Sequence, residues 1–290
     1  MKGIVLAGGK GSRLYPLTLP VSKQLLPVYD KPMIYYPLAT LMQARIREIL
    51  VITDSTQTDS FRHLLGDGNQ WGVEFTYVVQ DSPKGIAEAL ILGERFLSGE
   101  EFALILGDNL FHGPSLHERL AVPAGDSGSE AVVFAHPVRD PERYGVISFH
   151  EGRPLRIVEK PPQPESNLAV TGLYRYSNDA VEVAKNLKPS PRGELEITDV
   201  NNHYLQAGCL HCHTLGPGYA WLDTGTPEAM LQASEFVHAL QERQGMMIGC
   251  LEEIAYRNGW ITHDELQAQA ERLKPSDYGQ YLMSIAMRKS

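Results

Sequence analysis

The sequence predicts an α/β protein whose core is a doubly wound, mostly parallel sheet. In the first half, short and nearly continuous apolar runs alternate with segments whose apolar residues recur at helical spacing. Such runs are typical of strands covered on both faces, and their alternation with helices is typical of parallel sheets. The expected strands are Lys2–Ala7, Glu48–Thr53, Glu74–Val79 and Phe102–Gly107, and the expected helices are Met33–Ala44, Asp59–Leu65 and Ile86–Leu97.

The second half contains strand candidates that follow one another closely. This spacing favours an antiparallel or mixed extension of the same sheet, because antiparallel strands need only short connections. Just before them, Gly125–Gly128 has the composition of a surface loop. The candidates are Ala131–His136, Gly145–His150, Leu155–Glu159, Ala169–Ser177 and, after a turn at Ala207-Gly208, Cys209–Leu215.

The last part of the chain is expected to be helical. Thr226 and Pro227 are typical of a helix start, with Thr as the N-cap and Pro at the first helical position. The stretch Leu251–Arg288 has helical character and little strand character. We therefore expect an α/β core over residues 1–225 and a C-terminal helical segment over residues 226–290.

Charge and composition exclude several classes of protein. The formal net charge is −9, whereas a protein that binds free nucleic acid usually has a basic excess. No stretch approaches the roughly 18 apolar residues of a membrane span, and the apolar run at the start is too short for a signal peptide. The odd number of cysteines, three, fits a reducing compartment. The sequence therefore predicts a cytoplasmic protein without nucleic-acid or membrane partners.

A glycine-rich loop, within Leu6–Leu14, directly follows the first expected strand. Its glycines allow backbone N–H groups to approach a phosphate closely, and Lys10 and Arg13 add positive charge. It is not a Walker A loop, because Lys10 is followed by Gly11 rather than by Ser or Thr. It is not a dinucleotide-binding fingerprint either, because Leu14 stands where that pattern requires Gly or Ala.

The block Ser22–Pro37, with the sequence SKQLLPVYDKPMIYYP, follows this loop. Loop and block together closely resemble the sugar-nucleotide pyrophosphorylases, and within them the glucose-1-phosphate thymidylyltransferases; many members carry Thr where this chain has Ser12. The resemblance covers essentially the whole chain. It implies a Rossmann-like fold and an enzyme that condenses dTTP with glucose 1-phosphate to dTDP-glucose and pyrophosphate with Mg²⁺. It also divides the core into a nucleotide-binding part, about residues 1–130, and a sugar-phosphate-binding part, about residues 131–225.

The resemblance also implies which residues hold the nucleotide. The glycine-rich loop would surround the triphosphate, Lys23 would reach its phosphates, and Gln24 would lie beside the base pocket. Gln80 ends an expected strand, where ligands bind in open α/β sheets, and its amide can donate to and accept from the imide edge of thymine. The expected nucleotide ligands are Leu6, Gly8, Gly9, Gly11, Ser12, Arg13, Gln24, Gln80, Gly85 and Asp108.

Two aspartates are candidate metal ligands. Asp108 ends an apolar strand, and Asp223 precedes the helix start at Thr226. Mg²⁺ is usually held by one or two carboxylates together with substrate phosphates. Their spacing in the sequence does not show that they meet, but the family resemblance implies that they do.

The second half of the chain would bind the sugar phosphate. By resemblance, Glu159 would accept hydrogen bonds from sugar hydroxyls, and Lys160 and Arg192 would hold the phosphate, Lys as a point charge and Arg as a fork. The expected ligands are Tyr144, Gly145, Glu159, Lys160, Val170, Tyr174, Arg192 and Trp221. The expected catalytic residues are Arg13, Lys23, Asp108, Lys160 and Asp223.

The expected reaction is a direct displacement without a general base or a covalent intermediate. A phosphate oxygen of the sugar 1-phosphate would attack the α-phosphorus of dTTP, with cations offsetting the repulsion between the two anions. Members of the family are typically homotetramers with a regulatory site for a dTDP-sugar. His117, Glu118 and Glu252–Arg257 are candidates for that site.

Three other functions stay open. A uridylyl- or cytidylyltransferase of the same family would differ in only a few base contacts. A metal-dependent glycosyltransferase usually carries an Asp-x-Asp pair, and Asp108-Asn109-Leu110 lacks the second Asp. A non-catalytic sensor of nucleotide sugars would have little need for the complete set of catalytic residues.

Overall fold

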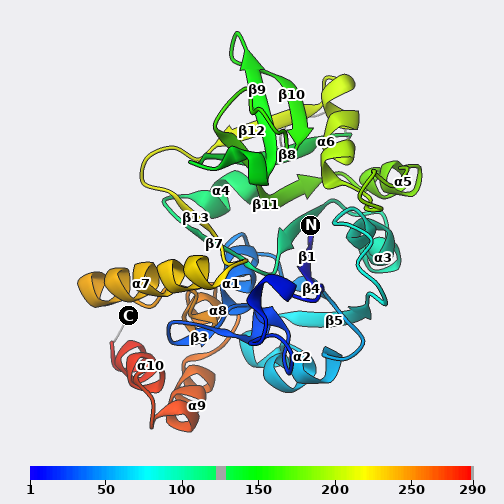
Figure 1. Cartoon of the computed structure of the whole chain (residues 1–290). Helices are drawn as coiled ribbons and strands as arrows, with labels where there is room; N and C mark the ends of the chain where they lie inside the picture. Colours follow the sequence, from blue (N-terminus) through cyan, green and yellow to red (C-terminus); the bar gives the residue numbers. More distant parts are fainter. Residues whose placement is uncertain (122–128, 289–290) are drawn as a thin grey trace.

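The computed structural model describes residues 1–121 and 129–288, and the loop expected at Gly125–Gly128 lies outside them. Within this part of the chain, nine strands form one mixed sheet (Figure 1). Four neighbouring strands are parallel, in the order β6, β1, β4, β5. They span Phe102–Leu106, Lys2–Ala7, Glu48–Thr53 and Glu74–Val79, almost as predicted.

The other five strands extend this sheet mainly by antiparallel pairs, which confirms the predicted extension. β11 pairs antiparallel with β6, β8 and β9, and β9 pairs antiparallel with β10, whereas β12 runs parallel to β8. The two expected parts of the core therefore share one sheet. The five strands are β8 (Ala131–Pro137), β9 (Gly145–His150), β10 (Arg153–Glu159), β11 (Leu168–Tyr176) and β12 (Leu210–Thr214).

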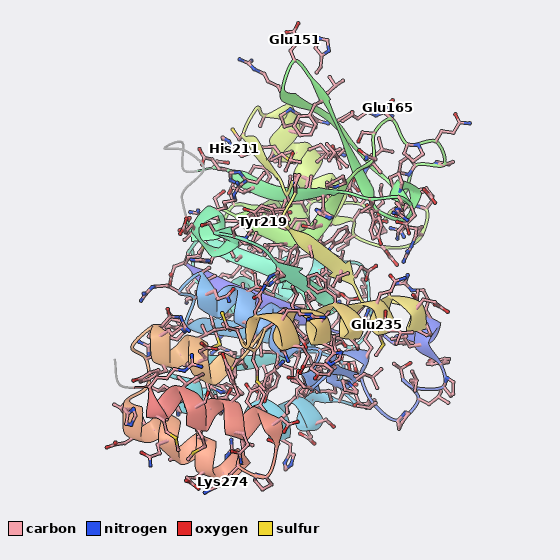
Figure 2. All side chains as sticks on the ribbon, turned by 90° about the vertical axis from the view of Figure 1, so that its left-hand side faces the viewer. Glu151, Glu165, His211, Tyr219, Glu235 and Lys274 are labelled. Atoms are coloured by element: carbon pink, nitrogen blue, oxygen red, sulfur yellow. The ribbon has the colours of Figure 1, made fainter. Side chains whose placement is uncertain are left out.

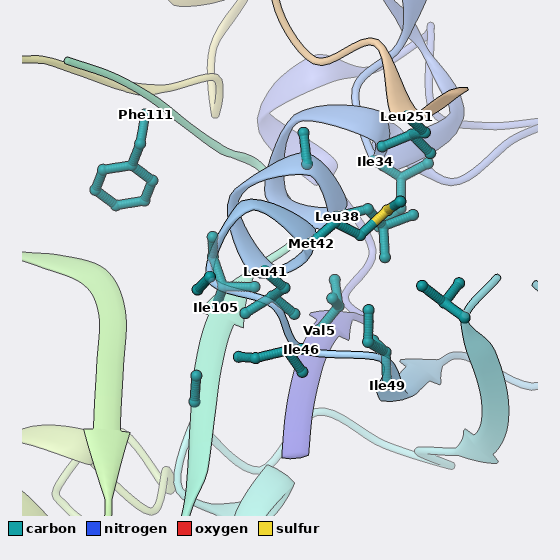
Figure 3. Close-up of a cluster of buried hydrophobic side chains, with 14 of the residues drawn as sticks. Val5, Ile34, Leu38, Leu41, Met42, Ile46, Ile49, Ile105, Phe111 and Leu251 are labelled. Atoms are coloured by element: carbon teal, nitrogen blue, oxygen red, sulfur yellow. The ribbon is translucent and has the colours of Figure 1, made fainter. Parts of the chain in front are cut away.

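Helices cover both faces of the sheet, as the predicted doubly wound arrangement requires. Successive strand residues point to opposite faces. Ile4 belongs to a buried cluster with residues of α3, α5 and α6, whereas Val5 belongs to another with residues of α1, α2 and α4. Figure 3 shows Val5 with Leu38, Leu41 and Met42 of α1 in the second of these clusters. The helices are α1 (Tyr35–Gln43), α2 (Thr58–Leu65), α3 (Glu88–Leu97), α4 (Leu116–Ala121), α5 (Ala180–Lys185) and α6 (Ile197–Gln206).

The C-terminal segment is helical, as predicted, and packs on the same core as α1. Thr226 caps the first of these helices, since its side chain accepts a hydrogen bond from the N–H of Ala229 at 3.2 Å. Figure 2 shows Lys274, between the last two helices, and Glu151, on the β9–β10 hairpin, at opposite ends of the molecule. The helices are α7 (Pro227–Gln244), α8 (Leu251–Arg257), α9 (His263–Leu273) and α10 (Asp277–Met287).

A buried ion pair joins the C-terminal helices to the N-terminal part of the chain. Lys31 lies in the short β2–β3 hairpin (Pro27–Val28 and Lys31–Pro32) and pairs with Asp30. Its Nζ also lies 3.3 Å from Gln241 Oε1 of α7 and 5.9 Å from the ring centre of Tyr278 in α10. Burial lowers the pKa of Lys31 despite the adjacent Asp30 carboxylate. The hairpin that follows Lys23 is therefore held directly by α7 and α10.

Several features were not predicted from the sequence, among them the β2–β3 hairpin and the helices α4, α5 and α6. The short strands β7 (Asn109–His112) and β13 (Ala220–Asp223) form an antiparallel pair outside the main sheet. Gly85, expected at a helix start, lies three residues before α3.

In the described residues, no helix is both long enough and apolar enough to span a membrane.

Candidate active site

A cleft of about 510 Å³ opens where two strands separate along one edge of β11. β8 pairs with both ends of β11, so β6 and β9 share the opposite edge. β9 pairs at Ala169 and β6 pairs from Leu173 onward, which leaves a gap between them. Val170 and Gly172, on either side of Thr171, line the cleft at this gap.

The cleft brings together ten of the residues expected from the sequence. Seven further lining residues had not been singled out as ligands. The expected ones are Arg13, Asp108, Tyr144, Gly145, Glu159, Lys160, Val170, Tyr174, Trp221 and Asp223, and the others are Ile86, Leu106, Asn109, Arg143, Gly172, Ile197 and Thr198.

Asp108 and Asp223 face the same cleft because their backbones are joined. Asp108 lies in the turn between β6 and β7, and Asp223 is the last residue of β13, where it is opposite Asn109 in the ladder. Thr224 adds two hydrogen bonds to the carbonyl oxygen of Asp108, from its N–H at 3.1 Å and from its hydroxyl at 2.7 Å. The two carboxylates are therefore fixed by backbone contacts on both chain segments.

Cationic side chains surround this pair of carboxylates. Lys23 Nζ forms an ion pair with Asp108 Oδ2, and Arg143 Nη2 lies 3.8 Å from Asp223 Oδ2. Arg13 reaches the same place, because a Cβ added to Gly225 would lie only 2.7 Å from its Nη2. The site thus places three cations beside two carboxylates.

These neighbours shift the pKa values of the two aspartates in opposite directions. Burial, the largest single cause, favours a raised pKa for Asp108, but the Lys23 charge and the hydrogen bonds from Lys23, Asn109 and the backbone together outweigh burial and lower the pKa. Burial and then the charge of Asp108 raise the pKa of Asp223. A divalent cation relieves such repulsion, and carboxylate oxygens are its preferred ligands. In residues 1–121 and 129–288, no group of three or more His, Cys, Asp or Glu is arranged to hold a metal ion.

Asn109 connects three parts of the cleft and was missed as a functional residue. Its side chain is 2% exposed. Its Oδ1 accepts hydrogen bonds from the N–H of Gly172 at 3.1 Å and from Trp221 Nε1 at 2.6 Å, and its Nδ2 donates to Asp108 Oδ1 at 3.0 Å. Asn109 therefore orients Asp108, a candidate metal ligand, and the indole ring of Trp221. It also provides the hydrogen-bond acceptor for the N–H of Gly172, in the gap along the edge of β11. Sequence alone shows only an Asn after a strand, which is common in turns.

The carboxylate of Glu159 is held by its neighbours on the other side of the cleft. Thr198 donates its hydroxyl to Glu159 Oε2 at 2.6 Å, and Arg192 Nη2 donates to Oε1 at 3.2 Å. Arg192 also pairs with Glu196 at 2.7 Å and does not line the cleft. The structure therefore brings Arg192 to Glu159 rather than to the cleft wall, and its expected contact with the sugar phosphate stays a prediction.

Lys160 follows β10 with a left-handed backbone, at φ 44°. This conformation is unfavourable for a residue with a Cβ. Its N–H donates to the carbonyl of Tyr144 at 2.9 Å, and its Nζ lies 3.6 Å from Glu159 Oε1. The turn thus directs a lysine into the cleft beside Glu159.

The glycine-rich loop separates this cleft from a second hollow of about 250 Å³, which Gly9 and Gln80 help to line. Gln24 lies beneath the loop and is 1% exposed. Its Oε1 accepts from the Ser22 hydroxyl at 2.6 Å, and its Nε2 lies 3.5 Å from the carbonyl of Gly8. Gln24 therefore supports the loop, a contact that the sequence did not predict.

The remaining expected nucleotide ligands line neither hollow and stay predictions. Gly85 has a structural reason to be glycine, because its φ is +103° and an added Cβ would lie 2.3 Å from the carbonyl oxygen of Leu195. Lys23 does not line the cleft itself, but it forms an ion pair with Asp108, which does. The residues concerned are Leu6, Gly8, Gly11, Ser12, Lys23, Gln24 and Gly85.

The chain is similar to known proteins over most of its length. The sequence model of the nucleotidyl transferase family matches residues 2–239. The chain is 54% identical over 286 residues to the glucose-1-phosphate thymidylyltransferase of Neisseria meningitidis, covering 98% of this chain and 99% of that protein. It is 50% identical over 289 residues to the protein of that name from Mycobacterium tuberculosis, covering 99% and 100%.

Two solved structures have a similar fold. A Bacillus anthracis protein assigned to the glucose-1-phosphate thymidylyltransferases, in complex with sucrose, has a TM-score of 0.76 and 42% identity, covering 81% of this chain and 94% of that one. A UDP-glucose pyrophosphorylase in complex with UDP-glucose has a TM-score of 0.69 and 26% identity, covering 82% and 98%.

The position of Thr224 generates a prediction about cation binding. Thr224→Val removes the hydroxyl that donates to the Asp108 carbonyl but keeps the shape of the side chain. We expect the affinity for Mg²⁺ to fall by about tenfold or more, the usual effect of removing a group that orients a metal ligand. Thr224→Ser keeps the hydroxyl and should bind as the unaltered chain does. Calorimetric titration measures both, and equal affinity of the Val and Ser variants would contradict this role.

Proposed function

Since this chain belongs to the nucleotidyl transferase family, we propose that it condenses dTTP with α-D-glucose 1-phosphate and releases pyrophosphate. The names of its relatives support this choice of substrates, because the sequences align over nearly their whole length. One observation carries the proposal. Asp108 and Asp223 lie together in a cleft whose opposite wall carries Glu159 and Lys160.

The cleft has the charges that two anionic substrates need. Arg13 and Arg143 lie near Asp223, and Lys160 lies on the side that would hold the sugar phosphate. Asp108 and Asp223 would hold Mg²⁺, which bound there would neutralise charge on the triphosphate. With the cation bound, Lys23 and Arg13 are available to stabilise the charge that develops on the departing pyrophosphate.

The reaction that we propose is an in-line displacement. A phosphate oxygen of glucose 1-phosphate bonds to the α-phosphorus of dTTP as the bond to the β-phosphate oxygen breaks. The attacking phosphate is already an anion at neutral pH, so the chain need not remove a proton. Positioning is then the main contribution of the protein, and it can supply several kcal/mol. Glu159, held by Thr198 and Arg192, is placed to orient the sugar ring through its hydroxyls.

The charged residues of the cleft predict large losses of turnover. We expect Asp108→Asn and Arg13→Ala each to lower turnover about 100-fold or more, as is typical when one preorganised electrostatic contact is lost. Pyrophosphate release from dTTP and glucose 1-phosphate measures the effect. Arg153→Ala, in the β9–β10 hairpin, serves as the control and should retain full activity. Near-normal turnover in both cleft variants would reject the proposed site, and no release by the unaltered chain would reject the proposed reaction.

Lys160 should act mainly on the sugar phosphate. Lys160→Ala removes a positive charge beside Glu159, so we expect the KM for glucose 1-phosphate to rise about tenfold or more while the KM for dTTP changes little. Steady-state kinetics with each substrate varied in turn separates the two. The exposed Lys188→Ala is the matched control. A rise confined to the KM for dTTP would place Lys160 on the nucleotide side instead.

We also propose the homotetramer and the feedback site that the sequence resemblance implies. A third hollow of about 290 Å³ is lined by His117, Glu253 and Arg257, which belong to the expected regulatory residues. Glu252 is 2% exposed and accepts a hydrogen bond from Tyr278, so it faces the interior instead. Light scattering should give the mass of four chains, and turnover should fall when a dTDP-sugar is added. The mass of one or two chains would contradict the assembly.

A further inference from the structure

The side-chain amide of Gln80 has a fixed orientation. Gln80 follows β5, is 5% exposed, and donates a hydrogen bond from its Nε2 to Glu88 Oε2 at 2.6 Å. An ionised carboxylate can only accept hydrogen bonds, so the NH₂ group must face Glu88. The same oxygen of Glu88 accepts from the N–H of Lys84 at 3.1 Å, which holds the carboxylate in the first turn of α3.

This orientation leaves the carbonyl oxygen of Gln80 as an unused acceptor. No group in residues 1–121 or 129–288 donates a hydrogen bond to it. It lies against the bare Cα of Gly8, since a Cβ added there would be 2.6 Å from Oε1. Gln80 therefore presents an acceptor, and not a donor, beside the glycine-rich loop.

A fixed acceptor at this place distinguishes between pyrimidine bases. Thymine and uracil carry a hydrogen on N3 and can donate to it, whereas N3 of cytosine is an acceptor and would be repelled. Loss of a hydrogen bond in a buried polar site costs far more affinity than loss of an apolar contact. If the amide turned over, it would present its NH₂ group and the preference would reverse.

We propose that Glu88 is a specificity-determining residue that acts through Gln80. It holds the amide with its carbonyl outward, so that the enzyme uses thymine and uracil nucleotides and rejects cytosine nucleotides. This inference rests on the proposed function and on the expected contact between Gln80 and the base. It does not distinguish thymine from uracil, because both carry the same imide hydrogen.

Glu88→Met tests this inference, because a thioether side chain of similar length replaces the carboxylate that accepts from Gln80. Gln80 can then adopt both orientations. We measure kcat/KM for dTTP, dUTP and dCTP with glucose 1-phosphate, which share the same deoxyribose. We expect the preference for dTTP over dCTP to fall about tenfold or more, while the ratio of dTTP to dUTP stays the same. Because the ratios are taken within one preparation, partial inactivation of the variant cancels.

Two controls separate the role of Glu88 from general effects of charge. Lys84→Met removes the ammonium that lies 3.8 Å from Glu88 Oε1 but leaves the carboxylate in place. Glu94→Gln removes another carboxylate of α3, one that pairs with Lys185. Both should keep the preference of the unaltered chain. An unchanged dTTP-to-dCTP ratio in Glu88→Met, or an equal loss in a control, would overturn the inference alone. Absence of turnover by the unaltered chain with all three nucleotides would overturn the proposed function as well.

Discussion

The mutual repulsion of Asp108 and Asp223 is the constraint around which the cleft is built. Two carboxylates in a largely buried place are unfavourable unless opposite charges or a cation compensate them. The chain supplies Lys23 and the two arginines for that purpose, and it fixes the backbones through the β7–β13 ladder and Thr224. Because the fold holds the two carboxylates close together despite their repulsion, the site is ready to bind a divalent cation.

The gap along the edge of β11 explains why this arrangement is possible inside a continuous sheet. Where β11 changes its neighbour from β9 to β6, some of its backbone N–H and C=O groups have no partner on an adjacent strand. Buried backbone groups of this kind need another hydrogen-bond partner. Asn109 accepts from the N–H of Gly172 with its Oδ1 and donates from its side-chain NH₂ group to Asp108 Oδ1, which orients that carboxylate. The solution of a folding problem and the orientation of a functional group thus depend on one side chain. The cleft lies where the sheet changes from parallel to antiparallel pairing.

Sequence reasoning found the elements whose signal is local and missed those that depend on distant partners. The buried parallel strands were evident because each is a continuous apolar run, and Thr226 was evident because capping is a local interaction. β7 and β13 have only four residues each, and they are strands only because the fold brings them together. Arg143 gave no signal, since an arginine in a loop is usually a solvated surface charge. Gln24 and Arg192, whose expected substrate contacts stay predictions, also contact other side chains, and a pattern of residue types does not reveal those contacts.

The Lys31 ion pair bears on how this protein can be recombined with its relatives. The family match ends at residue 239, yet Gln241 and Tyr278, which surround the ammonium, come after it. A chimera joined at residue 239 would take the β2–β3 hairpin, with Lys31, from one parent. The residues that line the Lys31 ammonium in α7 and α10 would come from the other parent. Unless the lining matched, the ammonium would keep Asp30 but lose its contacts with Gln241 and Tyr278, close to the segment that carries Lys23. A viable exchange must therefore transfer the hairpin and the terminal helices as a single unit.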